Sequence, residues 1–338
     1  MKNMNVTIKD IARHANVSYA TVSRALNDKY GVHPDTREKI LKAADELQYR
    51  PNALARSLVS SRSFTIGLIL PDITNPYYPE IAAGIEKASL EGGYGLLLCN
   101  TNGDMKRERK YVQLLAERRV EGILIAPTSE EGSEEESGIL SNLPIVYVSN
   151  APVRTSHSAV LIDNIRGGYI ATKHLIDCGY STLGFIGVQE EGMRDNERFE
   201  GYKNALERHG MNVDFDMCRF GTFRQKSGYE LIREMIKGGT VPRALFVEND
   251  NLAIGVLHGL KDSGIRVPQD IAVIGFDDIA YSSYPEVQLS TIRQPKDKMG
   301  KLAARLLIDE IESEERDSGP RTVIVEPELM VRSTTEKV

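Results

Sequence analysis

Beyond residue 63, short apolar runs alternate with longer stretches of helical periodicity. Eight such runs, rich in leucine and β-branched residues, extend from "FTIGLIL" (64–70) to "IAVIGFD" (271–277). Helical patterns such as those at 78–91 and 107–118 separate them. Continuous apolar runs between helices are typical of parallel strands that are buried on both faces. Residues 64–338 are therefore predicted to form an α/β body, and eight units favour two doubly wound lobes over one.

The first fifty residues have a purely helical pattern. Thr7 can cap a first helix with Asp10 three residues on, Asn16 suits a tight turn, Ser18 can cap a second helix, and Pro34 opens a third. The apolar positions predicted to face inward are Ile8, Ile11, Ala12 and Ala15, then Val22, Ala25 and Leu26, then Ile40, Leu41, Ala44 and Leu47. Three short helices with so small a core have the size of a helix-turn-helix head.

The segment "RPNALARSLVSS" (50–61) connects the head to the body. Pro51 occupies a good helix-opening position, and Leu54 and Leu58 lie four residues apart on one face. A helix of this length is too short to be stable alone in water, where ~12–15 residues are needed. We therefore expect this helix to fold only against a partner.

Charge is distributed unevenly between head and body. The chain has a net charge of −6, yet residues 1–62 carry 11 Lys and Arg against 6 Asp and Glu, and the remainder carries 31 against 42. A basic head on an acidic body indicates that the head contacts a polyanion. The outward face of the second helix is suited to DNA, because arginine can pair with guanine, alanine can contact a thymine methyl, and small hydroxyls can bind phosphates. These outward residues are Tyr19, Ala20, Thr21, Ser23 and Arg24.

Other classes of protein find little support. The three cysteines show no metal-ligand spacing and are expected to be free thiols in a reducing cytosol. No signal peptide and no apolar run of ~18 residues is present, so we expect a cytoplasmic protein without a membrane partner. The six histidines show no metal spacing, and neither G-x-S-x-G nor a strand-following GxGxxG occurs. The sequence therefore predicts no catalytic residues, no metal and no cofactor.

The stretches "TIKDIARHANVSYATVSRALN" and "TREKILKAADELQYRPNALARSL" resemble the DNA-binding head of the LacI/GalR family of bacterial transcription regulators. The resemblance implies a head at 1–50 and a hinge helix with its linker at 51–63, which folds when two subunits pair on operator DNA. It also implies that Leu58 wedges into the minor groove at a central CpG step and kinks the duplex. The residues that match base readers are Tyr19, Ala20 and Arg24, and those that match the hinge are Asn52, Ala55 and Arg56.

The resemblance continues to about Ser333 through "ITNPYYPEIAAGIE", "VENDNLAIGVLHGL" and "LSTIRQP". It implies a body similar to a periplasmic sugar-binding protein, with two lobes, three crossovers and a ligand cleft. The first lobe would comprise about 64–163 and 292–322, and the second about 164–291 and 323–333. The expected crossing points are Asp163 with Asn164, then Thr291, then Val323.

Five residues are candidates for binding an effector. Tyr77 and Tyr78 lie at a strand-to-helix junction, where open α/β sheets bind ligands, and their faces can stack on a sugar. Arg198 offers a fork of donors, while Asn249 and Asp277 each end an apolar strand. Where some purine- and ribose-responsive members have Asp-Trp after the fourth strand, this chain has Ser-Asn at 149 and 150, so no single effector is implied.

The sequence thus favours a homodimeric, ligand-controlled repressor that binds double-stranded operator DNA. The genes that it represses would serve carbohydrate utilisation, and a sugar-like inducer would release the repressor from a palindromic operator. A regulator that responds to a co-repressor or to a phosphorylated carrier protein is the main alternative. An enzyme acting on a small substrate is disfavoured by the missing motifs, and a transport-type binding protein by the DNA head and the absent signal peptide.

Overall fold

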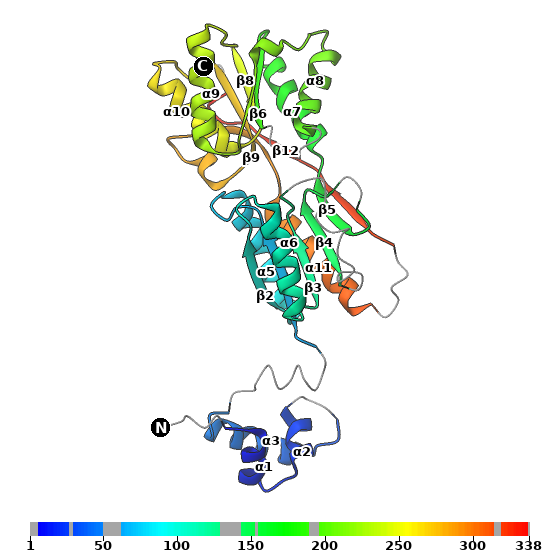
Figure 1. Cartoon of the computed structure of the whole chain (residues 1–338). Coiled ribbons are helices and arrows are strands. Elements are labelled where there is room, and N and C mark those ends of the chain that lie inside the picture. Colours follow the sequence, from blue (N-terminus) through cyan, green and yellow to red (C-terminus); the bar gives the residue numbers. More distant parts are fainter. Residues whose placement is uncertain are drawn as a thin grey trace. The chain divides into compact units, whose positions relative to one another are not determined.

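A computed structural model describes residues 6–26, 30–49, 62–128, 143–152, 155–188, 196–313 and 319–336. The chain divides into two compact units at Ser63 and Phe64, which is where the sequence places the start of the body (Figure 1). The predicted hinge residues Asn52, Ala55, Arg56 and Leu58 lie outside the described residues, so the hinge helix stays a prediction.

The first unit contains the three predicted helices, α1 (Ile8–Ala15), α2 (Tyr19–Leu26) and α3 (Pro34–Glu46). At the start of α1, the amide and the hydroxyl of Thr7 donate to the Asp10 carboxylate at 2.9 and 2.7 Å. Asn16 ends α1 in the left-handed conformation with φ 52°, and the Thr21 amide donates to the Ser18 hydroxyl at 3.1 Å to begin α2. The local signals for helix ends are therefore confirmed.

The core of this unit is small, as predicted, with one difference on α3. The buried residues are Ile11, Ala15, Val22, Ala25, Ile40, Ala43 and Ala44. Leu41 was predicted to face inward but is 50% exposed, and Ala43 is buried instead. At 100° per residue, Leu41 is turned away from the face that Ile40, Ala43 and Ala44 share.

The first lobe of the second unit is a parallel sheet of six strands in the order β11-β5-β4-β3-β1-β2. Helices α5 and α11 pack on one face and α6 on the other. The strands are β1 (Thr65–Leu70), β2 (Gly95–Asn100), β3 (Gly122–Ile125), β4 (Ile145–Ser149), β5 (Ser158–Ile162) and β11 (Thr322–Val325), and the helices are α5 (Tyr77–Glu91), α6 (Met105–Glu117) and α11 (Lys296–Glu312).

The second lobe has the same plan, in the order β12-β10-β9-β8-β6-β7, with only β12 antiparallel among its described strands. Helices α7 and α8 cover one face, and α9 and α10 the other. The strands are β6 (Leu183–Val188), β7 (Cys218–Gly221), β8 (Ala244–Val247), β9 (Ala272–Asp277), β10 (Ser290–Arg293) and β12 (Glu328–Met330). The helices are α7 (Asn164–Asp177), α8 (Glu197–Arg208), α9 (Gln225–Gly238) and α10 (Asp250–Asp262), with short 3-10 turns η1 (Phe215–Met217) and η2 (Ala280–Ser283).

Three crossovers join the lobes, and two of them differ slightly in position from the prediction. The first lies at Asp163 and Asn164, between β5 and α7, as expected. Thr291 lies within β10 of the second sheet, so the chain returns only after Arg293. Val323 lies within β11 of the first sheet, so the last crossing comes after Val325. Both expected boundaries were a few residues early, because an apolar run does not show which sheet its strand will join.

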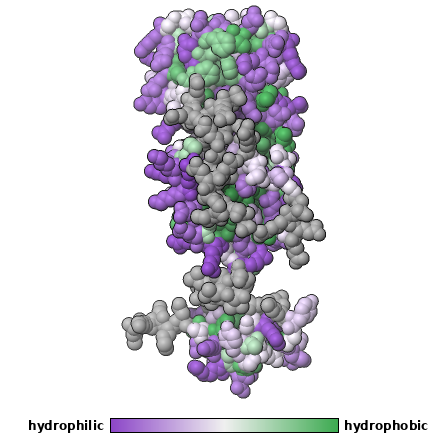
Figure 2. All heavy atoms as spheres, turned by 45° about the vertical axis from the view of Figure 1, so that its right-hand side comes forward, coloured by the Kyte–Doolittle hydropathy of each residue, from purple (hydrophilic) through white to green (hydrophobic). Residues whose placement is uncertain are grey.

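One strand departs from the predicted burial on both faces. β2 is an edge strand, and its Leu97 and Leu98 are 43% and 46% exposed. On the face drawn in Figure 2, the described surface is otherwise mostly hydrophilic, with apolar residues in small patches. Among the described residues, no helix is both long enough and apolar enough to cross a membrane.

Candidate functional site

The first candidate site is the outward face of α2. Tyr19 is 51% exposed, Ala20 and Arg24 are exposed, and Thr21 and Ser23 are half-buried. Val22 and Ala25, on the opposite face, are buried in the core of the head. All five predicted residues therefore lie away from the core, on a short helix whose width suits a DNA major groove.

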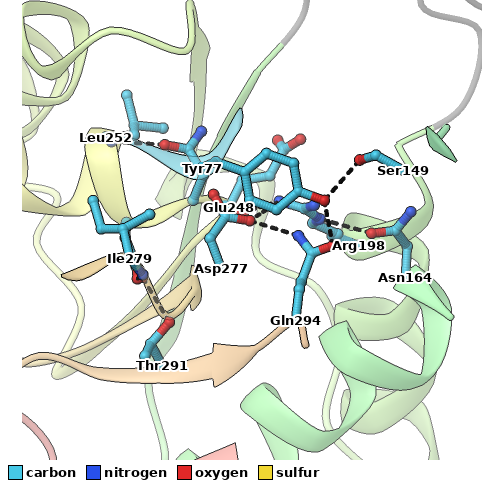
Figure 3. A network of polar contacts seen from close by, with 12 residues as sticks. Tyr77, Ser149, Asn164, Arg198, Glu248, Leu252, Asp277, Ile279, Thr291 and Gln294 are labelled. Carbon is cyan, nitrogen blue, oxygen red and sulfur yellow. Dashed lines mark hydrogen bonds and ion pairs between the residues drawn. The ribbon is translucent and has the colours of Figure 1, made fainter. Parts of the chain in front are cut away.

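The second candidate site is a network of polar side chains where the two lobes meet. Figure 3 shows its members converging from separate elements. We call it the interlobe network, and it consists of Tyr77, Ser149, Asn164, Arg198, Glu248, Asp277 and Gln294. Most of its members stand at the carboxyl ends of strands or at the starts of helices, which is where open α/β sheets bind ligands.

The first lobe contributes Tyr77, the first residue of α5. Its ring is buried, and its hydroxyl donates to Gln294 Oε1 at 2.8 Å. Because that hydroxyl has a single proton, the Ser149 hydroxyl must donate to it across the 2.8 Å contact at the end of β4. Tyr78 is partly buried and packs edge-on against Tyr77, with the ring centroids 5.1 Å apart. Tyr77 therefore links the two lobes through hydrogen bonds.

The second lobe contributes Arg198 from the first turn of α8. Its Nε donates to Asn164 Oδ1 at 2.9 Å, and its Nη1 donates to the Glu248 carbonyl at 2.7 Å and lies 3.5 Å from Asp277 Oδ1. The guanidinium also lies 3.8 Å from the centroid of the Phe276 ring. No acceptor for Nη2 is found among the described residues, so this nitrogen has two N–H donors to offer a ligand.

The backbone packing of α7 against α8 sets the position of this arginine. A Cβ at Gly168 of α7 would clash with the carbonyl of Arg198, and a Cβ at Gly201 of α8 would clash with the carbonyl of Ile165. The two glycines thus allow the helices to approach closely where α8 begins. This approach brings the Arg198 side chain to Asn164 at the first crossover.

Asn249 follows β8 and caps α10. Its Oδ1 accepts a hydrogen bond from the Leu252 amide at 2.8 Å, so the helix-cap role of this asparagine is real. Its Nδ2 is buried and has no partner among the described residues. Buried polar groups nearly always have a partner, so this exception keeps Asn249 among the candidate functional residues.

Asp277 ends β9 and is 4% exposed. Its Oδ1 accepts a hydrogen bond from Gln294 Nε2 at 2.7 Å, which connects it to Tyr77. Burial raises the pKa of the Asp277 carboxyl, while Arg198 and Lys296 oppose that shift. Burial also raises the pKa of Glu248, which accepts hydrogen bonds from the Val188 amide and the Asn196 side chain.

Asp250 is the first residue of α10 and is fully buried. It accepts hydrogen bonds from the hydroxyls of Ser282 and Thr291, both at 2.6 Å, and from the Ile279 amide at 3.0 Å. Burial, with the neighbouring Asp277 charge, raises the pKa of Asp250 to about 7. Asp250 therefore holds the segment that follows β9 against α10.

Three of the five residues predicted from the sequence, Tyr77, Arg198 and Asp277, are members of the interlobe network. Tyr78 and Asn249 are neighbours of it. Four further members were not predicted as ligands, namely Ser149, Asn164, Glu248 and Gln294. Each of them ends or follows a strand, and this was the available signal. No cluster of His, Cys, Asp and Glu that could hold a metal ion occurs among the described residues.

Comparisons with known proteins agree with a DNA-binding head followed by a two-lobed binding domain. Residues 7–52 match the family of bacterial regulatory proteins named lacI, and residues 172–335 match the periplasmic binding protein-like domain. The HTH-type transcriptional repressor PurR of Vibrio vulnificus is 36% identical over 98% of this chain and 99% of its own length.

Two solved structures have the same fold over nearly the whole chain. The lac repressor dimer bound to operator and the anti-inducer ONPF is 26% identical with a TM-score of 0.88, and covers 98% of this chain and 99% of its own. The transcriptional regulator CelR in complex with cellobiose is 31% identical with a TM-score of 0.72, and covers 97% and 99%.

A helix-turn-helix head joined to a two-lobed binding domain defines a ligand-responsive, DNA-binding transcriptional regulator. The chain belongs to the lacI family of bacterial regulatory proteins. Its relatives are transcriptional regulators rather than enzymes.

Proposed function

We propose that this regulator is a homodimeric repressor which leaves a palindromic operator when a sugar-like inducer binds between its lobes. The observation that carries the proposal is the pair of N–H donors on Arg198 Nη2, which has no acceptor among the described residues, on a guanidinium whose Nη1 lies 3.5 Å from Asp277 Oδ1. Asn249 Nδ2 likewise has no partner among the described residues. We call Arg198, Asn249 and Asp277 the effector site. A sugar hydroxyl both donates and accepts, so neighbouring hydroxyls match two donors and one acceptor.

The aromatic contribution to this site differs from the expectation of open tyrosine faces. The Tyr77 ring is buried, and its hydroxyl is shared between Ser149 and Gln294. We infer that Tyr77 connects the effector site to the first lobe, through the Gln294 side chain that bonds both Tyr77 and Asp277. Tyr78 is the better candidate for stacking on a ligand. Relatives of this chain include the CelR regulator, whose structure contains cellobiose, which supports a carbohydrate as the class of ligand.

Two features support a dimer on a two-fold symmetric operator. The edge strand β2 exposes Leu97 and Leu98, and exposed apolar edge strands invite pairing with another chain. The lac repressor, a structural relative, is a dimer on its operator. Two heads related by a two-fold axis require a near-palindrome, and a Leu58 wedge would require a central CG step that unstacks easily.

Two measurements test the proposal. Selection of duplexes by the full-length chain from a random pool should yield a palindrome with a central CG. A thermal-shift screen with pentoses, hexoses, disaccharides including cellobiose, and purine bases should identify a sugar that raises the unfolding midpoint, because ligands of the folded state stabilise it by mass action. The same sugar should weaken binding to the selected duplex in fluorescence anisotropy. A sugar that tightens DNA binding would make it a co-repressor, and stabilisation by a purine base alone would contradict the sugar class.

A further inference from the structure

The turn that follows β9 has an unusual backbone. Two successive non-glycine residues, Asp277 and Asp278, have positive φ values of 116° and 51°. We call these two residues the β9 turn. Side-chain-bearing residues adopt such values rarely and at a cost in free energy, so the surrounding structure must hold them. The turn matters because it aims the Asp277 carboxylate into the effector site.

Lys296 holds the main chain of the β9 turn. This lysine is 3% exposed and is the first residue of α11, directly after the second crossover. Its Nζ donates to the carbonyl oxygens of Asp277 and Asp278 at 2.7 and 2.6 Å. A buried ammonium needs such partners, and here both acceptors belong to the strained turn itself.

Two arginines bind the Asp278 side chain of the same turn. Arg293 Nε donates to Asp278 Oδ2 at 2.7 Å, and Arg332 Nη2 donates to Asp278 Oδ1 at 2.6 Å. Burial acts to raise the pKa of the Asp278 carboxyl, but the hydrogen bonds from Arg332 and Arg293 hold it below its ordinary value. Arg293 ends β10, just before the second crossover, and Arg332 follows β12, the strand that the chain enters after the third crossover. The β9 turn is therefore bonded to the chain segments next to both of these crossovers.

The third neighbour of Lys296 belongs to the first lobe, as Lys296 itself does, whereas the β9 turn belongs to the second lobe. Glu80 Oε2 lies 3.5 Å from Nζ, and Glu80 is in the first turn of α5, three residues after Tyr77. Contacts therefore run from the Asp277 main chain through one ammonium group to the helix of the first lobe that begins with Tyr77 and Tyr78. A second route, through the Gln294 side chain, reaches the same helix at the Tyr77 hydroxyl.

We propose that Lys296 is a positioning residue of the effector site, which fixes the β9 turn and connects it to α5 through Glu80. A displacement of Asp277 by a bound molecule moves the two carbonyls that Lys296 holds. The distance between the Lys296 ammonium and the Glu80 carboxylate then changes, and the first turn of α5, which carries Glu80, shifts with it. The proposal rests on the proposed role of Asp277 in effector binding and adds the residues that carry the signal between lobes.

Hydrogen–deuterium exchange on the full-length chain without any ligand tests the clamp itself. Lys296→Met keeps the aliphatic stem and removes the three donors, and Lys298→Met, an exposed neighbour on α11, is the matched control. Exchange at residues 277–279 and 77–82 should become about tenfold faster in Lys296→Met and remain unchanged in Lys298→Met. Glu80→Gln should accelerate exchange at 77–82 only. Equal exchange at 277–279 in Lys296→Met and in Lys298→Met would overturn the proposal.

A second readout separates positioning from a merely structural role, with cellobiose as the probe and the duplex selected by the wild-type chain. Lys296→Met should raise the dissociation constant for cellobiose about tenfold, because Asp277 loses its orientation. Glu80→Gln should bind cellobiose as the wild type does, yet release the duplex about tenfold less effectively. Identical losses in both variants would contradict the assigned route. A wild-type chain that ignores cellobiose counts against that sugar as the effector, and the exchange measurement then decides on Lys296 alone.

Discussion

Arg198→Ala is the sharpest perturbation of the effector site. The substitution removes the guanidinium that contacts Asn164, Glu248 and Asp277 together. It also removes the two N–H donors of Nη2. Hydrogen bonds to a charged group contribute about 1.5–3 kcal/mol each, so the loss of two such bonds to an inducer weakens its binding by at least about 3 kcal/mol. At 1.4 kcal/mol per factor of ten, the inducer concentration for half-release should rise by about a hundredfold or more.

DNA binding without inducer should change little in the same variant. The head forms its own compact unit up to Ser63, and the hydrogen bonds of Arg198 are made to residues of the second unit. The body itself loses stability, because removing one partner of a buried ion pair costs about 3–5 kcal/mol. Thermal unfolding of the variant must therefore be recorded first, so that binding is measured well below its midpoint.

Fluorescence anisotropy of the selected duplex, titrated with the sugar from the thermal-shift screen, provides the assay. Arg208→Ala, at the exposed end of the same helix, is the matched control and should respond to the sugar as the wild type does. If Arg198→Ala releases the duplex at the wild-type sugar concentration, the arginine is structural and the inducer binds elsewhere. An effector shifts DNA affinity only through a difference in its own affinity for two arrangements, so an inducer must rely on several such contacts at once.

Three further predictions address the hinge, the head and the second lobe. Leu58→Ala should weaken specific operator binding by more than ~1 kcal/mol and reduce DNA bending while sparing non-specific binding, as gel shifts on permuted fragments would show; equal bending would refute the wedge. Arg24→Ala should relax the preference at one symmetric base pair per half-site by ~1–3 kcal/mol in a competition assay, whereas a uniform loss over all sequences would make Arg24 a phosphate contact. Because the pKa of Asp250 is raised to about 7 in the folded chain, folding takes up a proton between about pH 4 and 7. Relative to Asp250→Asn, the free energy of unfolding of the wild type should therefore fall by up to about 1.4 kcal/mol per pH unit as pH rises from 5 to 7. Urea denaturation at several pH values measures this difference, and an equal change with pH in both proteins would contradict the prediction.

The sequence by itself determined the features whose partners are close along the chain. The starts of α1 and α2 depend on bonds between residues three apart, such as Thr7 with Asp10 and Ser18 with Thr21. The strands were visible because a buried strand must be apolar along its whole length. Asn249 and Asp277 were visible as candidate ligands because they are polar residues at the ends of such strands, and Arg198 because a guanidinium offers several donors.

Only the tertiary structure decided which of these residues meet. Tyr77 and Gln294 are hydrogen-bonded although 217 positions separate them, and no periodicity reports such a pairing. The same limit explains why two of the crossovers were placed inside β10 and β11 and not after them, since an apolar run indicates burial and not the strand beside it. Lys296 and Asp278 read as ordinary surface charges in the sequence. Both side chains are buried because two crossovers meet at the β9 turn. There the Lys296 ammonium binds the carbonyl oxygens of the turn, and the Asp278 carboxylate binds an arginine.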